Sequence, residues 1–135
     1  MLEVITKREL IERIVNVPKK DIAIRLGISQ QSFDATYKRS SSKLDLLYNI
    51  HKVQHKRFVL LLFENEYEYT SAASLILHIL SASKITPAEF RNKGIQLNYA
   101  LEKNTLTLKK FRRILDILGQ DFIVKVDKKF CIIED

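Results

Sequence analysis

Two adjacent glutamines, Gln30 and Gln31, directly follow Ser29, a residue type that commonly begins a helix. A glutamine amide donates and accepts hydrogen bonds together, so it matches the edge of an adenine base in the major groove of DNA. Asp34 and Lys38 follow at helical spacing on the same outward face. Gln30, Gln31, Asp34 and Lys38 are therefore the candidate base-reading residues.

The other residue types with catalytic or metal-binding chemistry are too sparse to form a reaction centre. His51 and His55 are four positions apart and could meet one metal ion from a helix, but the sequence offers no third ligand nearby. Cys131 is the single cysteine, which excludes an intrachain disulfide and a cysteine-based zinc site. The sequence also lacks a glycine-rich phosphate loop and the spacing of a catalytic triad. We therefore expect no enzymatic activity, no metal site and no cofactor.

The residues before the glutamines have the pattern of two short helices joined by a tight turn. Pro18 suits the first turn of a helix over 19–26, and Gly27 can take the left-handed conformation that ends it. Ala23 is small enough for close helix contact, and we expect Ile28 to be buried in the corner between the helices. In these residues the chain resembles the helix-turn-helix of the phage-repressor or Xre-like family.

That resemblance implies binding to double-stranded DNA and a role as a bacterial or phage transcriptional regulator. It extends to a closing helix that begins after Lys43 and, in a diverged second copy, to Gly94 and a similar closing helix over 108–119. The second copy lacks the Ser-Gln-Gln opening, so base reading is assigned to the first copy. The implied phosphate contacts are Lys19, Lys20, Ser32, Arg39 and Lys43, and the candidate contacts of the second copy are Asn98 and Lys103.

One apolar pattern occurs twice in the chain, which predicts two similar units, residues 1–70 (unit one) and 71–135 (unit two). We expect a mainly α protein with small β additions, in which each unit has four helices followed by a strand or hairpin. One chain would then supply two recognition helices as a pseudo-dimer, unless two chains form an ordinary homodimer. The first matched set is Leu10, Ile11, Ile14 and Val15, which recur 65 positions later as Leu75, Ile76, Ile79 and Leu80. The second set is Leu44, Leu47, Ile50, Val53 and Phe58, which recur 64 positions later as Leu108, Phe111, Ile114, Ile117 and Phe122.

Capping residues indicate where further helices begin. Thr6 is a plausible cap of the first helix, although its apolar spacing reaches back to Leu2. Ser41 or Ser42 is expected to cap the fourth helix, and Thr86 begins a capping box in unit two. Thr107 is expected to cap the helix over 108–118. Strands are expected at 58–63, 67–70, 122–126 and 130–133, with a hairpin turn at 64–66.

The 135 residues carry a net charge of +7, a field that favours a polyanion such as nucleic acid. The sequence contains no export signal and no apolar run of membrane-spanning length, so we expect a cytoplasmic, nucleoid-associated protein without a membrane partner.

Two other functions also fit the sequence. The first is a protein-interaction module on a repressor-like fold, such as an antitoxin or a phage-encoded inhibitor, because residues 64–69 are acidic and aromatic. The second is a virion or replication accessory protein that binds nucleic acid without sequence preference. A salt titration against random and selected duplexes would separate these three functions.

Overall fold

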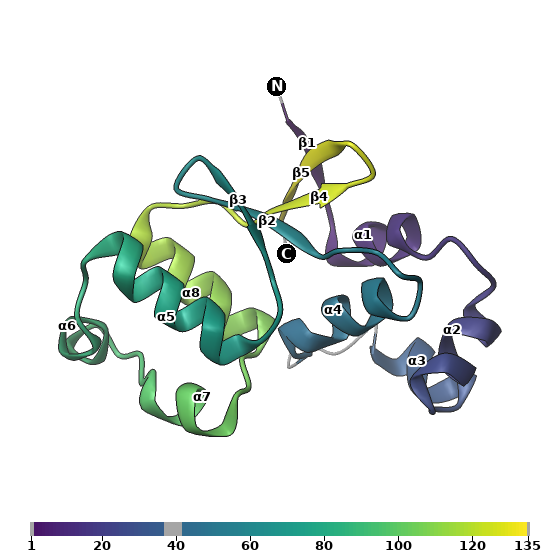
Figure 1. Ribbon diagram of the computed structural model, residues 1–135, viewed down its shortest axis with the longest axis horizontal. Helices are drawn as coiled ribbons and strands as arrows, with labels where there is room; N and C mark the ends of the chain where they lie inside the picture. Colours follow the sequence, from purple (N-terminus) through teal and green to yellow (C-terminus); the bar gives the residue numbers. More distant parts are fainter. Residues whose placement is uncertain (1, 37–41, 135) are drawn as a thin grey trace.

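The computed structural model describes residues 2–36 and 42–134 (Figure 1). Over these residues the chain forms eight helices and five strands, so it is a mixed α/β protein in which helices predominate. The helices are α1 (Lys7–Ile14), α2 (Lys19–Leu26), α3 (Gln30–Thr36), α4 (Leu44–Lys52), α5 (Ala72–Ser83), α6 (Pro87–Asn92), α7 (Asn98–Lys103) and α8 (Leu108–Leu118). No helix in the described part of the chain has the length and apolar character needed to cross a membrane.

The strands of both units join in one sheet. Its order is β1-β5-β4-β2-β3, and only the outer pair of β1 and β5 is parallel. The sheet covers one side of the helices, and its two halves meet where β2 lies beside β4 (Figure 1). The strands are β1 (Glu3–Ile5), β2 (Val59–Leu62), β3 (Asn65–Glu68), β4 (Ile123–Val126) and β5 (Lys129–Ile133).

Residues that are equivalent in the sequence repeat pair with each other at the junction of the two units. Leu60 of β2 pairs with Val124 of β4, and these positions are 64 residues apart. The starts of α4 and α8 meet in the same way, because Lys43 forms an antiparallel bridge with Thr107, again 64 residues on. An element that pairs with its own equivalent lies on a two-fold axis. The chain therefore has an internal pseudo-two-fold axis between β2 and β4 and between the starts of α4 and α8.

The two hairpins have the same register. Val59 pairs with Glu68 in the first hairpin, and the equivalent Ile123 pairs with Ile132 in the second. Each hairpin turns through two residues, of which Phe63 in the first has a φ of 52° and Asp127 in the second a φ of 56°. Positive φ values at the start of a two-residue turn match the twist of the flanking strands. The apolar repeat of the sequence thus corresponds to a repeated backbone structure.

Three local expectations were wrong. The first helix does not extend back to Leu2, because Glu3–Ile5 forms β1 and is held by parallel pairing with β5. The first hairpin turns at residues 63–64 instead of 64–66, so β3 starts at Asn65. Ser42 does not cap α4, since the N-cap is Lys43 and the Ser42 carbonyl accepts a bond of 2.8 Å from Leu108 N of the other unit. Ser41, the alternative cap, lies outside the described residues.

Other local signals were read correctly. Thr6 and Thr86 both form capping boxes with the glutamate three residues later, and Thr107 caps α8. The apolar stripes of both units converge on one continuous core beneath the sheet. Residues from both sides of the pseudo-two-fold axis are fully buried in this core, among them Leu47 and Ile50 from unit one and Phe111 from unit two.

Candidate nucleic-acid interface

The turn between α2 and α3 is built from short-range hydrogen bonds. Gly27 ends α2 in the left-handed conformation, with a φ of 74°, and Ile28 N donates to Ala23 O at 3.0 Å. Ser29 Oγ then accepts a bond of 3.0 Å from Ser32 N at the start of α3. Ala23 is buried, as expected from its size, but Ile28 is 38% exposed. The expectation that Ile28 is buried was wrong, and the buried residues of this segment are Ala23 from α2 and Phe33 from α3.

The first turns of α3 present polar side chains to solvent. Gln30, Gln31 and Asp34 are exposed, whereas Phe33 on the opposite face is fully buried. A short helix held by its cap and by one buried aromatic side chain keeps its polar face at a fixed orientation. The two glutamine side chains are therefore exposed to solvent on a helix that its cap and Phe33 hold against the core. Lys38, the fourth candidate base-reading residue, lies outside the described residues.

The candidate phosphate contacts are distributed around α3. Lys19 and Lys20 are exposed at the start of α2, and Lys43 is exposed at the start of α4. Ser32 is exposed on α3, where its hydroxyl accepts a bond of 3.0 Å from Ser29 Oγ. Arg39 lies outside the described residues. The lysines thus lie at the starts of α2 and α4, the helices that precede and follow α3 in the chain.

Two side chains that the sequence did not single out hold this helix pair in place. Gln54, just after α4, accepts a bond of 2.8 Å from Asn16 N and donates to Ile14 O and Ile50 O, each at 2.9 Å. Arg25 of α2 donates to Val53 O at 3.1 Å. Both join the α1–α2 segment to the end of α4. Only tertiary structure reveals them, because their partners lie about thirty to forty residues away in sequence.

Unit two makes the corresponding turn with a different surface. Gly94 has a φ of 87°, and Ile95 after it is buried, in contrast to the exposed Ile28. The following helix, α7, starts at Asn98 and lacks a side-chain cap hydrogen bond. Asn98 and Lys103 are exposed on it, and Tyr99 is 60% exposed. This helix therefore presents one amide and one large ring where α3 presents two glutamines.

The start of α8 supplies cations beside this second turn. Lys110 Nζ donates to Gln96 O, and Arg113 donates to Gly94 O at 3.2 Å. Burial and the charge of Arg113 both lower the pKa of Lys110, in that order. Lys109 is exposed on the next face, and the three side chains line a shallow cavity of about 420 Å³. At the equivalent positions unit one has Asp45, Leu46 and Asn49, so this basic cluster belongs to unit two alone.

The pseudo-two-fold axis determines where the two helix pairs lie. Figure 1 shows α2 and α3 at one end of the molecule and α6 and α7 at the other, both on the side opposite the sheet. Among the described residues no group of three or more His, Cys, Asp or Glu side chains gathers as a metal site. Comparisons with protein families, with curated proteins and with solved structures find no match for this chain.

Proposed function

We propose that this chain binds double-stranded DNA as an intrachain pseudo-dimer, in which unit one reads bases and unit two holds the phosphate backbone. The observation that carries the proposal is the pairing of repeat-equivalent residues on one axis, Leu60 with Val124 and Lys43 with Thr107. A two-fold arrangement of two turn-linked helix pairs on one side of a protein matches the two-fold arrangement of successive major-groove segments of a duplex. The resemblance of residues 23–33 to phage-repressor helix-turn-helix segments supports the same reading.

The assignment of base reading to unit one and of phosphate contacts to unit two rests on the different polar surfaces of the units. In unit one the exposed residues after the cap are Gln30 and Gln31, whose amides suit base edges. In unit two, Lys109, Lys110 and Arg113 form a cluster of exposed or partly exposed cations, and cations contact phosphate oxygens without regard to sequence. The preferred DNA site is then one specific half-site beside a tolerant stretch.

The test is a selection of bound sequences from a random duplex pool, followed by titrations of the selected duplex and of a random duplex. Changing Gln30 and Gln31 together to Ala should cost about 1–3 kcal/mol on the selected site and less on the random one. The matched control changes Asn98, Glu102 and Lys103 to Ala, which should leave base preference nearly intact. Equal losses on both duplexes from the glutamine variant would contradict base reading.

The phosphate contacts have a separate readout. Replacing Lys20 or Lys43 by Ala should weaken all duplexes alike and reduce the magnitude of the log-affinity versus log-salt slope by about 0.9. Lys93, exposed at the end of α6, provides the control substitution. A palindromic site whose halves are equally sensitive to α3 and α7 variants would overturn the division of labour in favour of a symmetric pseudo-dimer. Absence of salt-dependent binding to any duplex would overturn DNA binding itself.

The alternative of a protein-interaction module drew on the acidic hairpin at residues 64–69. Within that hairpin Glu66 forms an ion pair of 2.8 Å with Lys125, and Glu68 lies 3.5 Å from Arg57. Part of the acidic charge is therefore compensated inside the chain, which lowers its value for attracting a basic partner. If the salt titration detects no duplex binding, this alternative becomes the leading one.

A further inference from the structure

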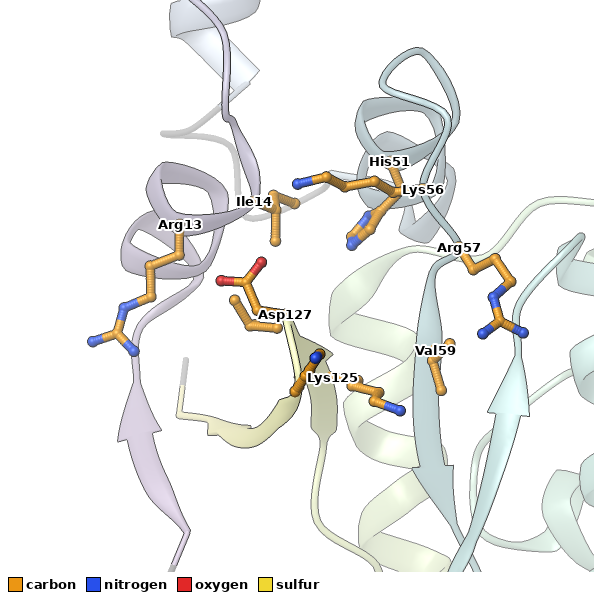
Figure 2. A pocket seen from close by; sticks show the side chains of 10 residues that line it. Arg13, Ile14, His51, Lys56, Arg57, Val59, Lys125 and Asp127 are labelled. Atoms are coloured by element: carbon orange, nitrogen blue, oxygen red, sulfur yellow. The ribbon is translucent and has the colours of Figure 1, made fainter.

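A basic cavity of about 380 Å³ lies beside the sheet, between the helices of unit one and the β4–β5 hairpin of unit two (Figure 2). Its walls come from the end of α1, from α4 and the segment after it, and from the β4–β5 turn. Small-molecule sites in proteins are commonly of about this size, roughly 300–1,000 Å³. Five of the lining side chains are cationic, and one is acidic. The cations are Arg13, Lys56, Arg57, Lys125 and Lys128, and the acid is Asp127.

The cations differ in how far the chain itself neutralises them. Arg13 makes two bonds with Glu3, at 2.6 and 2.8 Å, and Lys125 pairs with Glu66 at 2.8 Å. In contrast, the ammonium groups of Lys56 and Lys128 make no hydrogen bond or ion pair with any described residue. Both side chains are exposed at the rim. They are the cations available to an incoming anion.

The inner wall holds a buried imidazole. His51 is 3% exposed and stacks on Phe58 with 4.9 Å between the ring centroids. Its Nδ1 lies 2.6 Å from the Leu47 carbonyl oxygen, so Nδ1 carries the proton and Nε2 is left as an acceptor. Burial first, and then the charge of Lys56, lower the pKa of His51, while its bond to Leu47 opposes them. Figure 2 shows this ring pointing into the space that the lining side chains surround.

The pseudo-two-fold axis provides an internal comparison, because the symmetry-related place lies between the helices of unit two and the β2–β3 hairpin of unit one. At that place Arg13 is matched by His78, Lys56 by Gln120 and Arg57 by Asp121. Lys125 is matched by Leu61, Lys128 by Glu64, Asp127 by Phe63 and His51 by Leu115. Phe63 N donates to Gln120 Oε1 at 3.1 Å, and His78 stacks on Tyr67 at 4.5 Å. A hydrogen bond and a ring stack therefore occupy the symmetry-related place. Since the fold forms there without the cations, it does not require them around the basic cavity.

We propose that this cavity binds a small organic phosphate that carries hydroxyl or amino groups, such as a nucleotide or a sugar phosphate. Lys56 and Lys128 contact the phosphate oxygens. His51 Nε2 and the Asp127 carboxylate accept hydrogen bonds from the hydroxyl or amino groups of the same ligand. The donors of inorganic phosphate are P–OH groups on the same phosphorus that the lysines contact, whereas the ester offers further donors to His51 and Asp127, so the site favours the ester. This ligand site goes beyond the proposed DNA contact, which uses the side of the molecule opposite the sheet.

The test measures binding of AMP, GMP, UMP and glycerol phosphate by calorimetry, with adenosine and inorganic phosphate as half-ligand controls. At least one ester should bind saturably, and both controls should bind at least tenfold more weakly. Lys56→Gln installs the residue of the symmetry-related position, Gln120, and should weaken the ester about tenfold, as expected for one lost charge-assisted bond. Lys128→Glu installs the residue of its own symmetry-related position, Glu64, and should weaken the ester at least as much, because it also adds a negative charge. Lys93→Gln, which removes a lysine away from the cavity, should change nothing.

Further outcomes would overturn the proposal. The proposal fails if none of the esters binds saturably or if inorganic phosphate binds as tightly as the esters. It also fails if Lys93→Gln weakens ester binding as much as the cavity variants do. A short duplex offered as competitor separates the ligand site from the DNA contact. If the duplex displaces the ester and Lys56→Gln weakens both equally, the cavity holds nucleic-acid backbone and the small-ligand proposal fails. If the ester binds but no duplex does, the cavity proposal stands and the proposed DNA function fails.

Discussion

Removal of the Tyr69 hydroxyl tests how the segment between the units is fastened. Tyr69 lies between β3 and α5, and its side chain is buried against unit one. Its hydroxyl donates a bond of 2.6 Å to Asp45 Oδ1 on α4. The ring contacts Tyr48 and Phe58 at centroid distances of 5.6 and 5.4 Å. Tyr69→Phe deletes the hydrogen bond and keeps the ring contacts, so its effect on stability isolates the bond.

The expected loss of stability in Tyr69→Phe depends on the charge and exposure of the acceptor, Asp45. Hydrogen bonds to charged groups contribute roughly 1.5–3 kcal/mol, and a buried partner left without a bond adds a desolvation cost. Asp45 is only partly buried, so water can replace the lost donor and the value falls toward the lower end. We expect Tyr69→Phe to reduce the free energy of unfolding by about 1–2 kcal/mol. For a chain of this length the melting temperature should fall by about 3–10 °C.

Denaturant titration at neutral pH measures this loss, with Tyr67→Phe as the matched control. Tyr67 is partly buried and stacks on His78, but its hydroxyl makes no hydrogen bond to a described residue. The control should change the free energy of unfolding by less than about 0.5 kcal/mol. Equal losses in the two variants, or no loss in Tyr69→Phe, would refute the assignment.

The pH dependence of the same variant provides a second check. Burial, and then the bond to Asp45, raise the pKa of Tyr69 above its ordinary value of 10.0. The unfolded chain therefore releases this proton first, so the stabilisation is complete below pH 10.0 and is lost as the pH rises above it. The stability difference between the wild type and Tyr69→Phe should shrink above that pH. A constant difference would contradict the sign of the shift.

Three further substitutions test other parts of the structure. Leu60→Ala, at the pseudo-two-fold axis, should reduce the free energy of unfolding by about 2–5 kcal/mol in a denaturant titration, whereas Leu61→Ala on the other face of β2 should cost clearly less. Wild-type stability should fall as the pH drops below 6.5, because the pKa of His51 is lowered in the folded state and the unfolded chain binds that proton first. His51→Leu should make the free energy of unfolding less dependent on pH in this range, and an unchanged pH dependence would contradict the shift. Gln54→Ala should cost about 1–2 kcal/mol and accelerate hydrogen exchange of the Asn16 amide, and an unaltered exchange rate would show that Gln54 does not hold the α1–α2 segment.

Local signals predicted the elements well because each acts over a few residues. Thr6 and Thr86 cap helices through bonds to residues three positions away, and Gly27 ends α2 by its own backbone conformation. The strand β1 was not predicted, because it depends on residues far away in the sequence. Its residues have apolar spacing compatible with a helix, and the strand is fixed by partners such as Cys131, more than a hundred positions away. Ser42 was misjudged likewise, because its carbonyl bonds to the other unit.

The candidate sites divide in the same way. The glutamines of α3 lie in one continuous segment, so their exposure was predictable from the cap and from the buried Phe33. Their contact with bases stays a prediction. The basic cavity draws its lining from three separated segments, around Arg13, Lys56 and Asp127, and no short sequence window contains them all. Only the sheet, which brings the β4–β5 turn beside α1, assembles this cavity.

The position of the differences between the units bears on both proposals. On the pseudo-two-fold axis, apolar Leu60 faces its apolar equivalent Val124, since both must pack in one core. At exposed positions, where packing imposes little, the units diverge in charge: Arg57 stands where unit two has Asp121, and Glu64 stands where unit two has Lys128. A duplicated fold with one symmetric core can therefore carry two asymmetric surfaces at little cost in stability. For this reason variants that exchange the surface residues of the two units should change binding while leaving the unfolding transition nearly unchanged. A large loss of stability from such an exchange would mean that the divergent residues serve packing, and it would remove the physical basis for assigning them to ligands.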